Sequence, residues 1–277
     1  MRSTEKIVFL LILVSITGYA TAQQKAVDSL FAFREVARVR QLFTHLPVQI
    51  DIHIQNTADP VTSTRDTVQA DMNLYYGKTD FYMQAEGLEE IVNDSFIVMI
   101  NNPAKQILLY PNNQEVKRKM GSSVLMMLPD SSLQYLARTY RSSVQEEGGR
   151  KKIELKSRGM IFGTDLPKET LTLSYGPGSY EGAEFDQLKY QLLPVDSAIY
   201  AGMVKNKEYE GRLLSTPTNK GNLFFLVKRS TTSYMFKKIE YDIPDPPVRQ
   251  EDRILQAQDG SFIPAKGIKE YILSKEF

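Results

Sequence analysis

Residues 48–55 alternate strictly between apolar and polar side chains, and this pattern constrains the fold more than any other feature of the chain. On an extended backbone the two kinds of side chain fall on opposite sides: Val48, Ile50, Ile52 and Ile54 against Gln49, Asp51, His53 and Gln55. A strand with one apolar and one polar face is typical of an antiparallel sheet with one solvated side. We therefore expect such a sheet rather than a parallel α/β core.

The same alternation returns along the chain between turn signals. It predicts further strands over 68–76, 81–85, 96–100, 106–110, 153–156, 170–175, 185–193, 222–228 and 233–243. The early strands follow one another at roughly ten-residue spacing, which favours a meander. Residues 56–66 and 146–152 are rich in polar and turn-forming side chains, and we expect loops there.

Two segments have helical rather than strand periodicity. Residues 25–43 predict an amphipathic helix, with an apolar stripe and a wet face: Val27, Leu30, Phe31, Ala37 and Phe43 against Asp28, Arg34, Glu35, Arg38 and Gln41. A capping box at 131–134 predicts a second helix from 132 to about 140. The fold class is therefore α+β and β-rich: a half-open antiparallel β-barrel, or curved sheet, covered by the N-terminal helix and short central helices.

The first 22 residues have the features of a secretory signal peptide. Arg2 and Lys6 precede an apolar run over 7–16, and Ala20-Thr21-Ala22 fits a signal peptidase site. The run is shorter than the roughly 20 residues that span a bilayer, although an uncleaved N-terminal anchor is the alternative. We expect cleavage near Ala22, a periplasmic location with secretion as the alternative, and no transmembrane anchor after signal removal.

Charge and cysteine content limit the classes of partner and the domain organisation. The chain has 34 Lys and Arg against 33 Asp and Glu, so we expect no nucleic-acid partner. It has no cysteine and must fold without disulfides. Prolines at 244–247 suggest a boundary between a main domain over 23–243 and a C-terminal extension over 244–277, in which Asp259-Gly260 predicts a hairpin.

The sequence contains no strong catalytic or metal-binding signature. It has neither a G-x-S-x-G motif nor a P-loop, and its two histidines are His45 and His53. Asp51 and His53 share one strand face and could begin a metal site, but zinc needs three or four ligands. A solvated polar face explains them better. We predict no enzyme activity, no cofactor and no metal, and an enzyme hypothesis rests on this pair alone.

An apolar sheet face must be covered by helices or hold an apolar ligand. A Met-rich stretch at 122–128 is suited to a lid because methionine adapts to varied apolar shapes, although ordinary core filling would explain it too. The predicted ligand-binding residues are seven on strands and three in the lid: Ile50, Ile52, Ile54, Met72, Leu74, Phe81 and Met83, with Leu125, Met126 and Met127.

The order of these elements resembles a known family. An export signal, an amphipathic helix, long strands over 48–55 and 68–76, and the segments 81–83, 93–97 and 105–110 are arranged as in the periplasmic lipoprotein carrier (LolA-like) superfamily. Residues 75–80 stand where that family has Arg-Pro, and 93–95 replace its Asp-Gly turn. The resemblance implies an incomplete antiparallel barrel closed by helices. The family's arginine has no counterpart, and no functional residue is carried over.

Two hypotheses on function follow. The first is an exported, soluble bacterial envelope protein that binds a lipid, an acyl chain or a lipoprotein in an apolar half-barrel cavity, as a carrier, with envelope proteins as further partners. The second is a non-enzymatic structural or interaction protein of the envelope with a filled core, in which residues 244–277 form a docking arm. The sequence leaves the ligand and the oligomeric state open.

Overall fold

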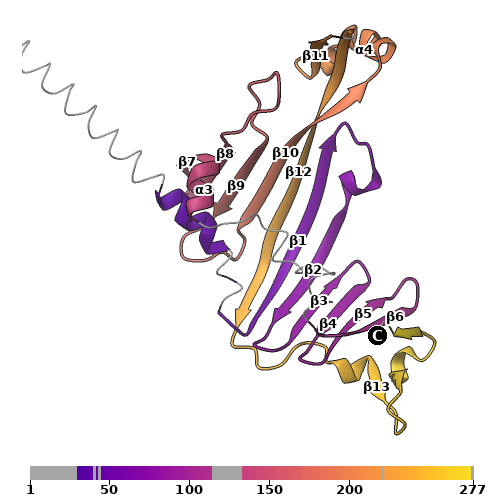
Figure 1. The fold of residues 1–277 in the computed structure, drawn as a ribbon. Coiled ribbons are helices and arrows are strands. Elements are labelled where there is room, and N and C mark those ends of the chain that lie inside the picture. Colours follow the sequence, from indigo (N-terminus) through magenta and orange to yellow (C-terminus); the bar gives the residue numbers. More distant parts are fainter. Residues whose placement is uncertain (1–29, 40–41, 43–44, 114–132, 220, 276–277) are drawn as a thin grey trace, which may run out of the picture.

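The computed structural model describes residues 30–39, 42, 45–113, 133–219 and 221–275 (Figure 1). The predicted signal peptide and the predicted lid residues Leu125, Met126 and Met127 lie outside these ranges. The strands are, in chain order, β1 (Val48–Asp59), β2 (Gln69–Tyr76), β3 (Phe81–Ala85), β4 (Leu88–Val92), β5 (Phe96–Asn101), β6 (Gln106–Pro111), β7 (Tyr140–Glu147), β8 (Arg150–Ser157), β9 (Glu169–Tyr175), β10 (Glu184–Val195), β11 (Leu213–Thr218), β12 (Gly221–Tyr241), β13 (Ile254–Gln256), β14 (Phe262–Pro264) and β15 (Ile272–Lys275).

Thirteen of these strands form one open sheet. Their order is β15-β6-β5-β4-β3-β2-β1-β12-β10-β9-β8-β7, and β11 pairs with β12 beside this path. Figure 1 places β7 and β6 on opposite sides of the molecule, so the described sheet does not close into a barrel. The prediction of a β-rich α+β fold built on an open sheet is confirmed. The sheet is mixed rather than purely antiparallel, because β15 runs parallel to β6.

The centre of the sheet is longer than the sequence pattern predicts. The segments 222–228 and 233–243 are parts of the single 21-residue strand β12, which pairs with both β1 and β10. Residues 229–232 carry no apolar alternation, but their backbone pairs with a neighbour on each side, so the ladder continues through them. For the same reason β1 extends to Asp59, into the predicted loop.

The predicted loop over 146–152 is the turn of a hairpin between β7 and β8. Glu147 pairs with Arg150, and only Gly148 and Gly149 lie between them. Both glycines have positive φ values, 59° and 78°, which glycine adopts without steric cost. The two glycines therefore allow the strands to continue through what the charged residues suggest is a loop.

The helices are α3 (Leu133–Thr139), α4 (Ser197–Val204) and a helical segment over 30–39, with 3-10 turns η1 (Thr64–Thr67), η3 (Lys207–Tyr209), η4 (Gln250–Asp252) and η5 (Lys266–Ile268). The predicted faces of the N-terminal helix are right only in part: Arg34 and Arg38 are exposed and Phe31 packs against a buried cluster, as predicted, but other positions differ. Leu30 is exposed, while the buried positions are Ala32, Phe33, Glu35, Val36 and Val39. The apolar pattern misplaced the face because Glu35 is buried against tyrosines that lie far away in the sequence.

Two hydrophobic cores lie on opposite faces of the sheet. We call the face with Val48, Ile50, Ile52 and Ile54 the inner face, and the opposite one the outer face. The inner core packs residues of β1, β2, β8, β9, β10 and β12 against segment 30–39 and Leu136 of α3. The outer core packs β2–β6 against the C-terminal extension, in which β13 and β14 pair on either side of Asp259 and Gly260.

Candidate functional site: the inner apolar face

Most of the predicted ligand-binding residues on the strands lie in the inner core. Five of them are at most 8% exposed, and they share one cluster with Phe33 and Val36 of the N-terminal helix: Ile50, Ile52, Met72, Leu74 and Phe81. Ile54 and Met83 are half-buried and pack against this cluster. A ligand would reach the first five only by displacing packed side chains. Whether any of the seven contacts a ligand stays a prediction.

The N-terminal helix is fixed to the sheet by the carboxylate of Glu35, which is 5% exposed. Tyr175 and Tyr180 donate hydrogen bonds to its Oε2 at 2.7 and 3.2 Å, and Arg38 Nη1 lies 2.7 Å from its Oε1. Burial, with the neighbouring carboxylate, raises the pKa of both tyrosines far above 10, so they remain donors at neutral pH. The helix therefore covers its part of the inner face through a satisfied polar anchor.

A second buried polar group ties together the strands beneath the helices. Tyr140 is fully buried and donates to the carboxylate of Glu169, which also accepts from Gln187. Burial is the main reason that the pKa of Tyr140 is raised, followed by its bond to Glu169. These contacts join β7, β9 and β10, and make this half of the inner face a packed, hydrogen-bonded unit.

The inner face continues over β3–β6, where its burial is less complete. The strand register aligns one row of side chains there, which we call the meander row: Met83, Glu90, Met99 and Leu108. All four are half-buried. The adjacent row contains Val92, Ile97 and Tyr110 on the same face. This part of the sheet therefore presents an apolar surface that the described helices do not bury completely.

Glu90 is the one ionisable side chain of the meander row. Its carboxylate has neither a hydrogen bond nor an ion pair within the described part of the chain. Burial raises the pKa of this carboxyl above its ordinary value, because the apolar neighbours disfavour the charged form. An unpaired acid in an apolar row costs folding free energy, and such residues concentrate at functional sites.

The outer face of β1–β3 carries a polar cleft of about 420 Å³ instead. It is lined by Asp51, Ile52, Asp71, Met72, Asn73, Gln84, Ala85, Glu86 and Lys237. Asn73 donates a hydrogen bond to Asp51, while Asp71 contacts His53 Nδ1 at 2.8 Å and Lys237 Nζ at 2.7 Å. The bond from Lys237 is the main reason that the pKa of Asp71 is lowered.

The two predicted residues therefore have different partners: Asp51 accepts from Asn73, and His53 contacts Asp71. In the part of the chain that the structure describes, no three His, Cys, Asp or Glu side chains are placed to hold a metal ion. The pattern of one strand could not identify Asp71 and Lys237 as partners. Asp71 faces His53 through the β1–β2 register, and Lys237 lies at an irregularity in the β1–β12 pairing.

The outer face of the meander is closed by the C-terminal extension. Glu89 of β4 is 5% exposed and accepts from Arg253 Nε and from Asn102 Nδ2, each at 2.8 Å. Tyr271 donates to Asn102 Oδ1 at 2.8 Å, which ties the end of the extension to the β5–β6 turn. Residues 244–275 therefore form part of the fold, and only their outward side chains could contact a partner.

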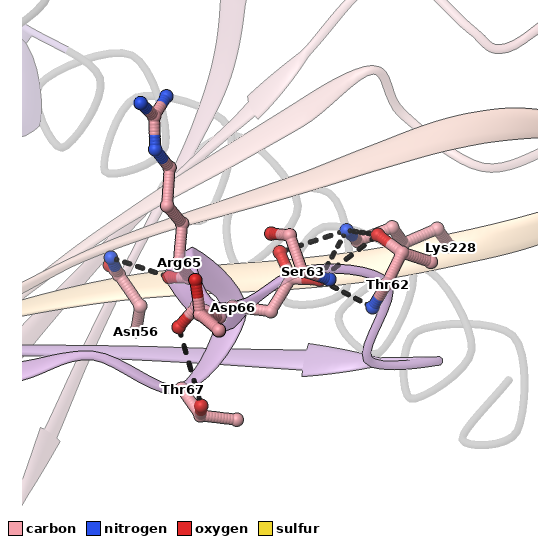
Figure 2. A network of polar contacts seen from close by, with 8 residues as sticks. Asn56, Thr62, Ser63, Arg65, Asp66, Thr67 and Lys228 are labelled. Carbon is pink, nitrogen blue, oxygen red and sulfur yellow. Dashed lines mark hydrogen bonds and ion pairs between the residues drawn. The ribbon is translucent and has the colours of Figure 1, made fainter.

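A buried ion pair fixes the turn between β1 and β2 (Figure 2). Lys228 Nζ of β12 lies 2.7 Å from Asp66 Oδ2, and the backbone N–H groups of Thr62 and Ser63 donate to the same oxygen at 2.6 and 2.9 Å. Chiefly through Lys228, these bonds hold the pKa of Asp66 far below its usual range. Both charged groups of the pair are satisfied, because Lys228 also donates to the Thr62 hydroxyl, and we interpret the pair as structural.

Comparisons with known proteins give little guidance on this site. The sequence matches no known family profile and no curated protein. Among solved structures, the chain is similar to a DUF1329 family protein from Desulfovibrio piger, with 10% sequence identity and a TM-score of 0.27. The match covers 79% of this chain and 95% of that chain. A TM-score this low carries no argument about fold or function. Within the described residues, no helix has the length and apolar character to cross a membrane.

Proposed function

We propose that the protein is an exported bacterial envelope protein that binds a lipid, an acyl chain or a lipoprotein on the inner face of its sheet and acts as a carrier. In this proposal the open sheet is the half-barrel of the LolA-like superfamily, and the N-terminal signal directs the chain to the periplasm. Ligand binding needs no covalent chemistry, since burying an acyl chain contributes about 0.8 kcal/mol per CH₂ group.

The observation that carries the proposal is the meander row. Its outer face is packed beneath the C-terminal extension, yet Met83, Met99 and Leu108 on the inner face are only half-buried. Methionine side chains adapt to ligands of varied shape. The row continues directly from Leu74 in the packed core, so an acyl chain lying along it would extend an existing apolar surface.

The test is titration of a fluorescent long-chain acyl probe into the wild-type protein and into Met83→Glu and Met99→Glu. A charge placed under the chain should weaken binding at least about tenfold. Leu255→Glu, at an exposed position of β13, is the matched control and should bind like wild type. Unchanged affinity in both meander variants, with circular dichroism showing that they are folded, would refute the proposal.

The second candidate is a non-enzymatic structural or interaction protein of the envelope with a filled core. It is favoured by the nearly complete burial of Ile50, Ile52 and Leu74, which belong to the same packed cluster as side chains of the N-terminal helix. The C-terminal extension would then dock partners through outward side chains such as Ile263 and Ile272, which are exposed. Absence of probe binding, together with loss of an envelope partner in Ile263→Glu and Ile272→Glu, would favour this candidate over the first.

A further inference from the structure

The carboxylate of Glu90 is the one feature of the meander row that binding of a plain acyl chain leaves unexplained. Six glutamates with described side chains are buried or half-buried. Five of them have a hydrogen bond or an ion pair: Glu35, Glu89, Glu154, Glu169 and Glu240. Glu90 has neither within the described residues. It is therefore the one shielded glutamate whose charge the described chain does not compensate.

The neighbouring residue of β4 shows what a shielded carboxylate requires. Glu89 points to the outer face, where Arg253 and Asn102 donate to it. Glu90 points to the inner face, between Met83 of β3 and Met99 of β5. Burial raises the pKa of Glu90, and a cation beside it would favour the charged form again. The missing partner of Glu90 is therefore a positively charged group.

The position of Glu90 on the inner face matches the border between the two parts of an amphiphile. The register places one further row on each side of the meander row: Ala85, Leu88, Asn101 and Gln106 on one side, and Phe81, Val92, Ile97 and Tyr110 on the other. In the first of these rows Leu88 is 49% exposed and Gln106 is exposed, whereas Ile97 in the other is 4% exposed. Glu90 therefore lies between a solvated row and a more shielded, largely apolar one.

The charges around the meander also favour a cation over an anion. Glu90 is the only charged side chain at the inner-facing positions of β3–β6 and β15. The turns of the meander, segment 30–39 and the ion-pair partner of Lys105 add further charges. These described segments together hold four cations and six carboxylates: Arg34, Arg38, Lys78 and Lys105 against Glu35, Asp80, Glu86, Glu90, Asp94 and Glu270. The surroundings of Glu90 therefore stay negative when every nearby element is counted.

We infer that the inner face of the meander binds a long-chain amphiphile with an ammonium group, and that Glu90 is the counter-charge of this group. The ammonium contacts Glu90, and the chain covers the apolar side chains beside it. The inference rests on the proposed function, because it names the class of ligand for the same site. Glu90 is then a specificity-determining residue, since the carboxylate of a fatty acid cannot pair with it.

Isothermal titration calorimetry with dodecylamine, dodecanol and dodecanoate at neutral pH tests the inference. The wild-type protein should bind dodecylamine at least about tenfold more tightly than dodecanoate, with dodecanol between them. Glu90→Gln and Glu90→Met should each reduce this preference to less than about threefold. Glu184→Gln removes one negative charge from an exposed position on the outer face of β10, and as the matched control it should keep the full preference.

Two lysophospholipids distinguish the possible sources of the ammonium group. Lysophosphatidylethanolamine carries it in the headgroup, and lysophosphatidylglycerol lacks it. Tighter binding of the first, with the difference lost in Glu90→Gln, would assign the ammonium to a phospholipid headgroup. A preference for dodecylamine together with equal binding of the two lysophospholipids would assign it to the end of the chain itself.

The outcomes separate this inference from the proposed function. Equal affinity of the wild-type protein for dodecylamine and dodecanoate would overturn the inference and leave acyl-chain binding standing. An unchanged preference in both Glu90 variants, or an equal loss of preference in Glu184→Gln, would overturn it as well, with circular dichroism showing that the variants are folded. If the wild-type protein binds none of the three dodecyl ligands, the proposed function and the inference both fail.

Discussion

The two cores of this protein are built in the same way, but they cover opposite faces of the sheet and so leave different parts of it uncovered. Each covers one face of the sheet with a segment from one end of the chain, and each is anchored by a buried glutamate, Glu35 or Glu89. The N-terminal helix covers the inner face beside β8 and β9, whereas the C-terminal extension covers the outer face of β3–β6. The comparison shows that the meander β3–β6 is packed on its outer face, by the C-terminal extension. Its inner face therefore remains as the candidate site.

The largest expected effect comes from truncating a central residue of either core. Leu74→Ala in the inner core and Leu109→Ala in the outer core each remove a fully buried side chain. Each should lower the free energy of unfolding by about 2–5 kcal/mol, through lost transfer energy and a residual cavity. Urea denaturation measures both. A loss under about 1 kcal/mol at Leu109 would contradict the view that the extension completes a true core.

The two glutamate anchors should differ in strength. Glu89→Gln leaves Arg253, whose side chain is 25% exposed, without a counter-charge, and should cost about 2 kcal/mol. Glu35→Gln should cost about 1 kcal/mol, because Arg38 is 58% exposed and water can solvate its charge. Denaturation of both variants at neutral pH measures the difference. A larger loss for Glu35→Gln would show that its two tyrosine contacts outweigh the ion pair.

Alkaline pH should weaken the outer core through Tyr82. Burial, with the nearby Glu89, raises the pKa of this phenol to about 12. In the unfolded chain the phenol loses its proton near pH 10, so the unfolded state binds fewer protons above that pH. Stability should be unaffected by Tyr82 below about pH 10 and should fall from about pH 10 to about pH 12. Tyr82→Phe should flatten this decline, and an unchanged slope would contradict the assignment.

The smallest expected effect is a gain in stability at the meander row. The raised pKa of Glu90 means that the folded state holds its proton more tightly than the unfolded state. Stability should therefore fall as the pH rises from the ordinary carboxyl range through the raised value. Glu90→Gln should remove this fall and stabilise the protein at pH 7 by up to about 1 kcal/mol, since the site is partly solvated. A destabilised variant would indicate a partner for the carboxylate.

Alternation predicts the strands well because a half-buried strand must show it. The segments 48–55, 68–76, 81–85 and 106–110 all lie within observed strands or extend them by a residue, and so the open sheet could be predicted. The parallel pairing of β15 and the continuation of β12 could not, since both depend on the backbone of distant neighbours. Helix α4 is short and lacks an apolar stripe, so its periodicity gives no signal.

The candidate site was predicted only as far as one strand can specify it. Alternation places Ile52, Leu74 and Met83 on a common face, and the register agrees. It cannot distinguish the covered part of that face from the half-buried part, because the cover comes from segment 30–39, whose buried face includes Glu35. Likewise, the contribution of Met99 and Leu108 follows only from the pairing of β4, β5 and β6.

Photolabelling with a diazirine-bearing fatty acid tests the central claim most directly. After illumination of the wild-type protein, mass spectrometry of its peptides locates the labelled residues. The account predicts saturable labelling of the peptides that contain Met83, Met99 and Leu108, which excess unlabelled fatty acid suppresses. No saturable labelling, or labelling confined to the outer face and the C-terminal extension, would contradict it.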